Sequence, residues 1–297
     1  MTGAKRLACS RLAPRRSRSS QIPVAKNILN MLLVIDIGNT NTSLGVFEGD
    51  RLVAHWRLTT ERARTVDEWG VLARNLFQLS GLDVKSIDAI AIASVVPPLN
   101  FTLNRMAEIY FGLTPLFVDH TIDTGVAILY QPAADVGADR IVDAVAAIRK
   151  YGAPCIVVDF GTATTFDAIN SSGEYVGGVI TPGITISADA LFDRAAKLPR
   201  VEIKRPQKVI GSATVAAMQS GLYHGYIGLV DGILKKMIDE LGRSPRVIAT
   251  GGLAPLIARG SKFIQEVDET LTLEGLRLVY ERAGRPKSKV QSPKSES

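Results

Sequence analysis

Short apolar runs separated by turn residues divide the chain from residue 31 onward into strands and helices. Residues 32–37 are apolar except for Asp36 and run into a Gly-Asn pair, which predicts a buried strand followed by a tight turn. Extended segments follow at 43–47 and 52–58, with a short polar turn between them. The chain therefore begins with a three-stranded meander.

The remaining pattern predicts alternating helices and strands. A helix begins after Thr65, whose hydroxyl suits an N-cap, and ends before Gly81. The further predicted elements are a strand at 87–94, a helix at 99–111, a short strand at 116–118, a helix from 137, a strand at 156–160, a strand and turn at 177–183, helices at 184–196 and 214–241, a strand at 247–250 and a closing helix at 271–282. In the longest helix, Gly221, Gly225 and Gly228 predict the close approach of another element.

Two distant segments share one pattern. Residues 34–42 and 157–165 both read apolar-apolar-Asp-apolar-Gly, followed by polar residues that end in Thr. Each is followed by an extended segment, a turn and another strand, and such a repeated match is far rarer by chance than one short motif. The sequence therefore predicts two copies of one α/β unit, with a first domain over residues 31–150 and a second over 151–284.

Composition sets limits on the class of protein. The chain has 297 residues, 46% of them hydrophobic, which suits two domains with large cores. The formal charge of +6 belongs to the ends, because residues 1–30 carry +7 and residues 285–297 carry +3, leaving −4 for the body. A mildly acidic body argues against nucleic-acid binding.

Membrane and secreted classes are also disfavoured. No apolar run approaches the length of a membrane span. Cys9 and Cys155 are too few for a disulfide framework or a cysteine-rich zinc site, so a reducing cytoplasm is expected.

The N-terminal extension, residues 1–30, is rich in Arg and Ser and free of acids. This composition is similar to that of a transit peptide. Met31 directly precedes the first strand, so we expect translation to begin there instead. Residues 1–30 and 285–297 are expected to be disordered.

Small, hydroxylated and amide side chains follow Asp36. Gly38 leaves backbone N–H groups open to a ligand, which suits a phosphate with its metal ion. Further donors are Asn39, Thr40 and Thr42. A plain Asx turn between two strands fits the same residues, but the repeat of the pattern at Asp159 favours the phosphate loop.

Two domains that each begin with strand–Asp–Gly–Thr predict a ligand held in a cleft between them. Carboxylates with Gly and Thr donors suit a nucleoside triphosphate with Mg²⁺, which bridges carboxylate and phosphate oxygens. Neither a Walker-type loop nor a protein-kinase loop is present in the sequence. The first half of the site is therefore expected to supply little cationic charge, so metal ions must carry the charge of the phosphates. Gly251 and Gly252 fit either an adenosine contact or a helix-start turn.

Asp139 stands at the start of a predicted helix, where an acid is favoured for structural reasons alone. It also fits a general base that takes a proton from an attacking hydroxyl, with Arg140 beside it to hold an anionic group of the substrate. Asp159 fits a second Mg²⁺ ligand or a ligand of another cation, and Thr162 fits a phosphate contact.

Five motifs in order carry a family resemblance. They lie at 36–41, 137–140, 159–165, 177–183 and 211–214. Together they closely resemble the bacterial type III pantothenate kinases, of the acetate kinase, sugar kinase, Hsp70 and actin (ASKHA) superfold. The resemblance covers nearly all of residues 31–284 and implies an α/β fold of two duplicated ribonuclease H-like domains with a nucleotide cleft between them.

The resemblance implies an activity and its cofactors. The activity is ATP-dependent phosphorylation of pantothenate to 4'-phosphopantothenate, the first step of coenzyme A biosynthesis. It also implies Mg²⁺ with ATP, a monovalent cation (K⁺ or NH₄⁺) and a homodimer.

The resemblance further implies residue roles. The ATP phosphate loop would consist of Asp36, Ile37, Gly38, Asn39, Thr40, Asn41, Thr42 and Ser43, with Thr162 as another contact. Asp36 would hold Mg²⁺ through water, and Asp159 would bind the monovalent cation. Pantothenate would contact Tyr130, Gly137, Ala138, Asp139, Arg140 and Thr214, with Asp139 as the general base. The N-terminal extension and Ala213, where Asn or Ser is common, depart from the family pattern.

Two alternatives remain. A kinase of the same fold could act on a sugar or an acyl substrate, since fold alone does not set the substrate. A non-catalytic regulator could contact DNA through its basic arm. Tyr130 with 137–140 favours pantothenate, and the retention of Asp36, Asp139 and Asp159 argues against an inactive site.

Overall fold

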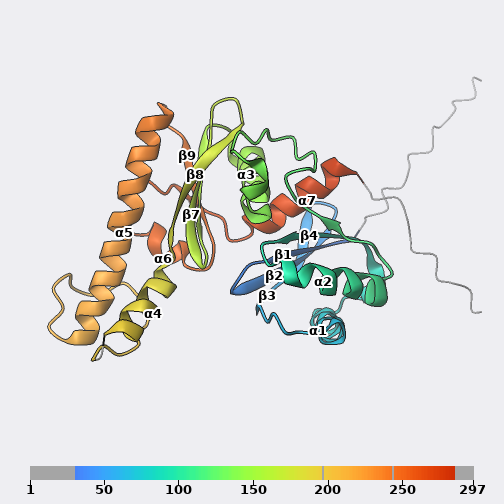
Figure 1. The fold of residues 1–297 in the computed structure, drawn as a ribbon, viewed down its shortest axis with the longest axis horizontal. Coiled ribbons are helices and arrows are strands. Elements are labelled where there is room, and N and C mark those ends of the chain that lie inside the picture. Colours follow the sequence, from blue (N-terminus) through green and yellow to red (C-terminus); the bar gives the residue numbers. More distant parts are fainter. Residues whose placement is uncertain (1–30, 196, 243, 285–297) are drawn as a thin grey trace, which may run out of the picture.

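The computed structural model describes residues 31–195, 197–242 and 244–284. Within these ranges the chain forms two α/β halves, each built on one five-stranded sheet (Figure 1). The expectations for residues 1–30 and 285–297 lie outside the described residues.

The sheet of the first half has the strand order β3-β2-β1-β4-β5. β1 pairs antiparallel with β2 and parallel with β4, and β2 pairs antiparallel with β3, so the predicted meander is confirmed. The bounds are β1 Met31–Ile37, β2 Asn41–Glu48, β3 Arg51–Thr59, β4 Ile87–Ser94 and β5 Leu116–Phe117.

The sheet of the second half repeats this arrangement as β8-β7-β6-β9-β10. β6 pairs antiparallel with β7 and parallel with β9, as β1 does with β2 and β4. The bounds are β6 Cys155–Phe160, β7 Ala163–Ile169, β8 Tyr175–Pro182, β9 Arg246–Thr250 and β10 Glu266–Val267. The equal topology confirms the internal duplication, whereas the two-residue strand β10 carries no sequence signal.

The helices follow the predicted order closely. Their bounds are α1 Val66–Leu79, α2 Asn100–Met106, α3 Ala138–Tyr151, α4 Ile184–Arg194, α5 Thr214–Leu241, α6 Ala254–Ala258 and α7 Leu271–Ala283, with short helical turns η1 Val84–Ser86, η2 Pro97–Leu99, η3 Ala107–Phe111 and η4 Ala133–Asp135. The predicted cap of α1 is confirmed, because Thr65 and Glu68 form a reciprocal capping box. Among the described residues, no helix combines the length and apolar character needed to cross a membrane.

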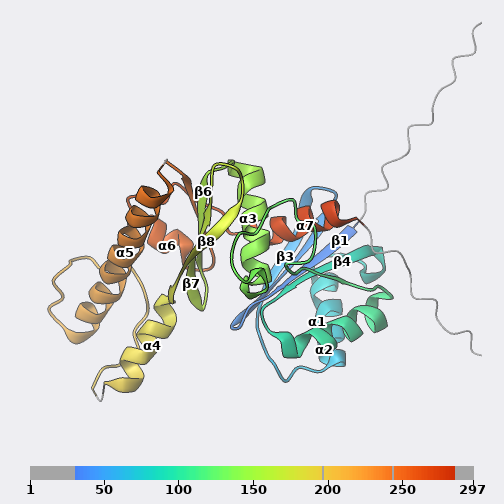
Figure 2. The ribbon, with the colours of Figure 1, turned by 45° about the horizontal axis from the view of Figure 1, so that its top comes forward.

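Helices α3 and α7 connect the two halves (Figure 2). Val142 of α3 packs in the core of the first sheet, while Ile141 packs in the core around β6. α7 returns to the first sheet, where Leu276 joins the same core as Val142. Gly275 makes the crossing possible, because a Cβ there would lie 2.0 Å from the Val142 carbonyl oxygen. Helix α3 therefore carries residues of both cores, and its first turn faces the space between the sheets.

The expectation for the glycines of α5 is wrong within the described residues. A Cβ built on Gly221, Gly225 or Gly228 would meet no atom within 4 Å. α5 instead packs on the second sheet through other side chains, including Tyr223 and Val230.

Candidate active site

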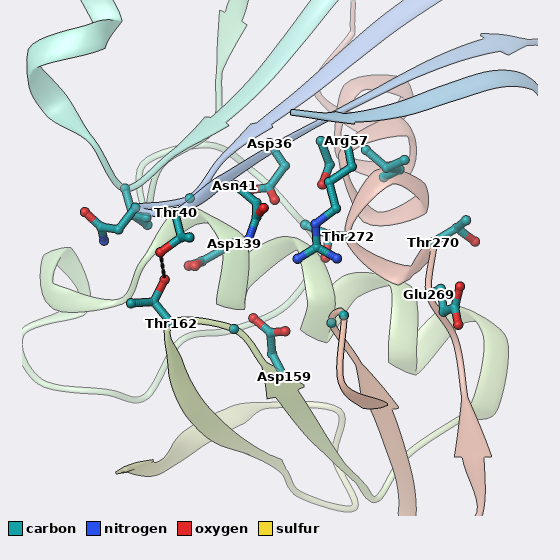
Figure 3. Close-up of a pocket in the computed structure, with 18 of the residues that line it drawn as sticks. Asp36, Thr40, Asn41, Arg57, Asp139, Asp159, Thr162, Glu269, Thr270 and Thr272 are labelled. Atoms are coloured by element: carbon teal, nitrogen blue, oxygen red, sulfur yellow. Dashed lines mark hydrogen bonds between the residues drawn. The ribbon is translucent and has the colours of Figure 1, made fainter. Parts of the chain in front are cut away.

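A cavity of about 490 Å³ lies between the two halves (Figure 3). Its walls come from the β1–β2 turn, β3, the start of α3, the β6–β7 turn, the turn after β9 and the segment that enters α7. The predicted residues that line it are Asp36, Gly38, Asn39, Thr40, Asn41, Ser43, Asp139, Asp159 and Thr162. The fold thus brings together most of the predicted phosphate loop and all three predicted carboxylates.

Hydrogen bonds behind the cavity shape the β1–β2 turn. The N–H of Gly38 donates to the carbonyl of Asn41 at 3.0 Å, and the hydroxyl of Thr60 donates to the carbonyl of Gly38 at 2.7 Å. Thr42 is buried and shares a 2.9 Å hydrogen bond with Thr60. Thr42 therefore supports the turn from behind, and Ile37 belongs to the core; neither lines the cavity.

Three aspartates share the cavity, and their pKa values are raised. Burial, followed by the charges of Asp139 and Asp159, holds the pKa of Asp36 well above its usual range. Burial and the Asp139 charge raise the pKa of Asp159 to about 7. Burial raises the pKa of Asp139, although the backbone N–H of Arg140 donates to its Oδ1 at 2.8 Å. Such a cluster favours a bound cation, which would relieve the repulsion.

Glycines hold two of these carboxylates closely. A Cβ on Gly251, whose φ is +88°, would lie 2.4 Å from Oδ1 of Asp159. A Cβ on Gly137 would lie 2.4 Å from Oδ1 of Asp139. Both positions therefore require glycine if the carboxylates are to keep their places.

Loops from the two halves meet at one end of the cavity. The Oγ1 atoms of Thr40 and Thr162 lie 2.7 Å apart (Figure 3). Gly183 packs against the carbonyl of Thr162, where a Cβ would lie 2.2 Å from the oxygen. The β1–β2 and β6–β7 turns are therefore in direct contact.

Arg140 and Tyr130 do not line the cavity. Nε of Arg140 donates to Oδ1 of Asp167 at 2.7 Å, and the hydroxyl of Tyr175 donates to the same oxygen at 2.6 Å. The ring of Tyr130 lies 6.5 Å from that of Tyr175. The structure thus groups two predicted pantothenate residues around one buried carboxylate, next to the first turn of α3.

The other predicted pantothenate residues are dispersed. Gly137 and Ala138 sit at the start of α3 but outside the cavity lining. Thr214 is exposed at the start of α5, and α5 covers the face of the second sheet that points away from the first half (Figure 1). One chain therefore does not bring Thr214 to the cavity.

The sequence did not single out several cavity residues. Arg57 of β3 points into the cavity (Figure 3), so the expectation that the first half of the site supplies little cationic charge is wrong. Its signal was the alternation in 52–58, which puts every second side chain on one face. The segment before α7 adds Glu269 and Thr270, and the first turn of α7 adds Thr272 and Leu273. No sequence motif marks these four residues.

Solved structures share this fold. A protein from Sinorhizobium meliloti described as a 2-dehydro-3-deoxygalactonokinase is 13% identical, with a TM-score of 0.52 over 89% of this chain and 100% of the other. A Campylobacter jejuni protein described as a Baf family transcriptional activator is 20% identical, with a TM-score of 0.52 over 84% and 98% of the two chains. These likenesses show the fold alone. Together with the duplicated sheets, they define the fold class, which has two actin-like, ribonuclease H-like domains.

Closer relatives give the family. The family model for type III pantothenate kinase matches residues 32–236. A type III pantothenate kinase of Koribacter versatilis is 58% identical over 262 residues, covering 85% of this chain and 96% of the relative. One of Anaeromyxobacter is 60% identical over 252 residues, covering 85% and 99%. The chain belongs to the type III pantothenate kinase family: it is a kinase that phosphorylates pantothenate in coenzyme A biosynthesis.

Proposed function

We propose that Asp139 is the general base of this reaction. It takes the proton of the terminal hydroxyl of pantothenate while that oxygen bonds to the γ-phosphorus of ATP and the bond to the bridging oxygen breaks. The products are 4'-phosphopantothenate and ADP. The observation that carries the proposal is the place of Asp139, which lines the cavity between the phosphate loop and the pantothenate residues around Arg140.

The structural role of Asp139 is compatible with catalysis. Its Oδ1 accepts the N–H of Arg140 in the first turn of α3, which fixes the carboxyl group. Burial raises the pKa of Asp139, and a base with a raised pKa accepts a proton more readily once it is ionised. In phosphoryl transfer such a carboxylate chiefly orients the nucleophile.

The donor set of the cavity fits hard cations. We propose that Asp36 holds Mg²⁺ through water and that Asp159 binds K⁺ or NH₄⁺, because both side chains offer only oxygen and line the same cavity. No group of three or more His, Cys, Asp or Glu side chains within the described ranges is arranged to hold a metal ion. When bound with ATP, Mg²⁺ neutralises phosphate charge, while Ser43, Thr40 and Thr162 offer hydroxyl donors to the phosphates.

We propose that Tyr130 and residues 137–140 form the pantothenate site, with Arg140 facing the anionic end of the substrate. The buried pair of Arg140 and Asp167 supports this, since it fixes the guanidinium next to Asp139. Pantothenate has both a hydroxyl and a carboxylate, so one end can reach the base while the other reaches Arg140.

Thr214 reaches pantothenate, in this proposal, from a second copy of the chain in a homodimer. Exposed apolar side chains on β8, on α4 and around the start of α5 support an interface there. They are Ile180, Ile186, Leu191, Val209, Ile210 and Val215. Ile210→Asp, with 88% of the isoleucine exposed, should convert a dimer to a monomer in light scattering, and an unchanged mass would remove this interface.

We also propose where the two domains divide and in which compartment the enzyme works. The chain passes from the first domain to the second between residues 150 and 151, and α7 then returns to pack on the first sheet. The enzyme works in the cytoplasm without nucleic-acid or membrane partners. The repeated sheets and the net charge of −4 over residues 31–284 support these statements.

The test is a pantothenate-dependent ADP-release assay of the chain that starts at Met31, with and without K⁺. Turnover that requires pantothenate and rises with K⁺ or NH₄⁺ is expected. Equal turnover with sugars or acetate would contradict the substrate assignment. Turnover that ignores the monovalent cation would contradict the role of Asp159.

A further inference from the structure

A row of three side chains crosses the first sheet at the edge of the cavity. Asp36 on β1 is paired with Ser43 on β2, and Ser43 is paired with Arg57 on β3. Directly paired residues of antiparallel strands project from the same face of the sheet. All three side chains line the cavity, so the fold places a guanidinium in the same row as the phosphate loop.

The duplicated row of the second sheet lacks this cation. There Asp159 on β6 is paired with Thr165 on β7, and Thr165 is paired with Ile180 on β8. The carboxylate and the hydroxyl are thus repeated in both halves, whereas the third position is Arg57 in one and an exposed Ile180 in the other. Of the cavity-lining residues that the structure describes, Arg57 alone is a lysine or arginine.

The Arg57 guanidinium reaches the other half of the molecule. A Cβ on Gly252, in the turn after β9, would lie 2.7 Å from Nη1. In Figure 3 the guanidinium points from β3 towards the side where Asp159 lies. Its charge opposes the effect of burial on the pKa of both Asp36 and Asp159. Arg57 therefore lies between the two halves, within electrostatic reach of a carboxylate from each.

Its donors are available for a ligand. Many of the described arginines make hydrogen bonds or ion pairs, including Arg62 to Asn39 and Arg140 to Asp167, whereas Arg57 makes neither with any described residue. A planar guanidinium with five N–H donors is suited to phosphate oxygens, which it can bind in pairs. Among the carboxylates of this cavity, a transferred phosphoryl group also needs positive charge that stays in place as the bonds change.

We propose that Arg57 binds the γ-phosphate of ATP and stabilises the charge that develops on it during transfer. This inference rests on the kinase reaction, since it assigns one more residue to that site. Two other roles lead to different results. Arg57 could only offset the charges of Asp36 and Asp159 before ATP binds, or it could contact the nucleoside beside Gly252.

The test compares Arg57→Gln and Arg57→Lys with Arg51→Gln as the matched control. Arg51 lies on the same strand, is exposed and forms a surface ion pair with Glu48. Replacing it should therefore leave the activity unchanged. For Arg57→Gln, kcat should fall about 100-fold, as when one preorganised transition-state donor is removed. Arg57→Lys should recover part of the loss, and guanidinium ion added to Arg57→Ala should restore part of it.

Binding measurements separate the alternatives without requiring turnover. Arg57→Gln should weaken a non-hydrolysable ATP analogue about tenfold, the value of one charge-assisted contact, while ADP affinity stays within about twofold. If Arg57→Gln loses equal affinity for ADP and for the ATP analogue, the γ-phosphate assignment is overturned, and Arg57 contacts the nucleoside instead. If kcat and both affinities stay unchanged in Arg57→Gln, the γ-phosphate assignment is overturned, and Arg57 only offsets the charges of Asp36 and Asp159. If the unmodified chain shows no pantothenate-dependent turnover, the kinase assignment fails, and the analogue-against-ADP comparison still decides the role of Arg57.

Discussion

The Oγ1 atoms of Thr40 and Thr162 lie 2.7 Å apart, although 122 residues separate them in the sequence. Thr40 belongs to the turn after β1, and Thr162 belongs to the equivalent turn after β6. The duplicated motif is therefore brought face to face, and each copy presents a hydroxyl at the same end of the cavity. A phosphate chain bound there is in reach of donors from both halves.

Thr162→Val tests this arrangement. The substitution removes the hydroxyl while nearly keeping the shape, so one direct phosphate donor and the contact with Thr40 are lost. A hydrogen bond contributes about 0.5–1.5 kcal/mol, which corresponds to a rise in KM for ATP of about 2- to 12-fold. Steady-state kinetics at varied ATP concentrations measure this KM. Thr114→Val, at an exposed position outside the cavity, is the control and should leave KM unchanged. An unaltered KM in Thr162→Val would exclude a phosphate contact.

The two motif aspartates could be predicted because their signal is local and repeated. Strand, carboxylate, glycine and threonine follow one another within a few residues, so the local sequence alone predicts that Asp36 and Asp159 lie at strand ends. Arg57 could not be found in this way. Its relation to Asp36 runs through the register of β2, which is a property of the paired sheet and not of the local sequence.

The closing helix shows a second limit of prediction. Its length and bounds follow from the apolar pattern, but nothing local marks that α7 returns to the first sheet and that Glu269 and Thr272 then line the cavity. Similarly, Gly221 in α5 suggested a packed helix crossing, whereas the described residues leave that surface open. Periodicity identifies which face of a helix is small or apolar, but not which partner covers it.

Asp139→Asn tests the general base. Asparagine keeps an oxygen that can accept the N–H of Arg140, so the first turn of α3 and the fold should be preserved. Loss of proton transfer to a positioned base costs about 10²- to 10⁴-fold in rate, and kcat should fall by that factor. Asp135→Asn, at an exposed carboxyl in η4, is the control and should keep full turnover. Near-normal kcat in Asp139→Asn would leave Asp139 only its structural role at the helix start.

The acid side of the pH profile provides an independent measure. Burial raises the pKa of Asp139, so the group takes up its proton at a higher pH than an ordinary carboxyl group. A protonated base is inactive, hence the decrease of kcat/KM with decreasing pH should begin above about pH 4, the usual carboxyl value. Because Asp36 and Asp159 have raised pKa values and interact with Asp139, the apparent value describes the cluster. A decrease of kcat/KM that begins only at or below pH 4, with the enzyme still folded, would contradict this prediction.

Stability depends on the buried pair between Arg140 and Asp167. The Asp167 side chain is fully buried and also accepts the hydroxyl of Tyr175, and its burial raises the pKa of the carboxyl while Arg140 opposes that shift. Asp167→Asn leaves a buried guanidinium without its counter-charge, which costs about 3–5 kcal/mol. Urea denaturation measures the free energy of unfolding. Tyr175→Phe removes only one hydrogen bond to the same carboxylate and should cost about 1–3 kcal/mol.

The matched control for this pair is Asp239→Asn, which breaks the exposed pair with Lys235 on α5. An exposed ion pair one helical turn apart contributes about 0.3–0.5 kcal/mol, so the free energy of unfolding should hardly change. The contrast between the two sites follows from solvation: water replaces the lost partner of Lys235, whereas only 8% of the Arg140 side chain is exposed, so water replaces its partner much less well. A loss of less than about 1 kcal/mol in Asp167→Asn would show that Arg140 finds another partner or is hydrated, and it would remove the basis for a fixed guanidinium beside Asp139.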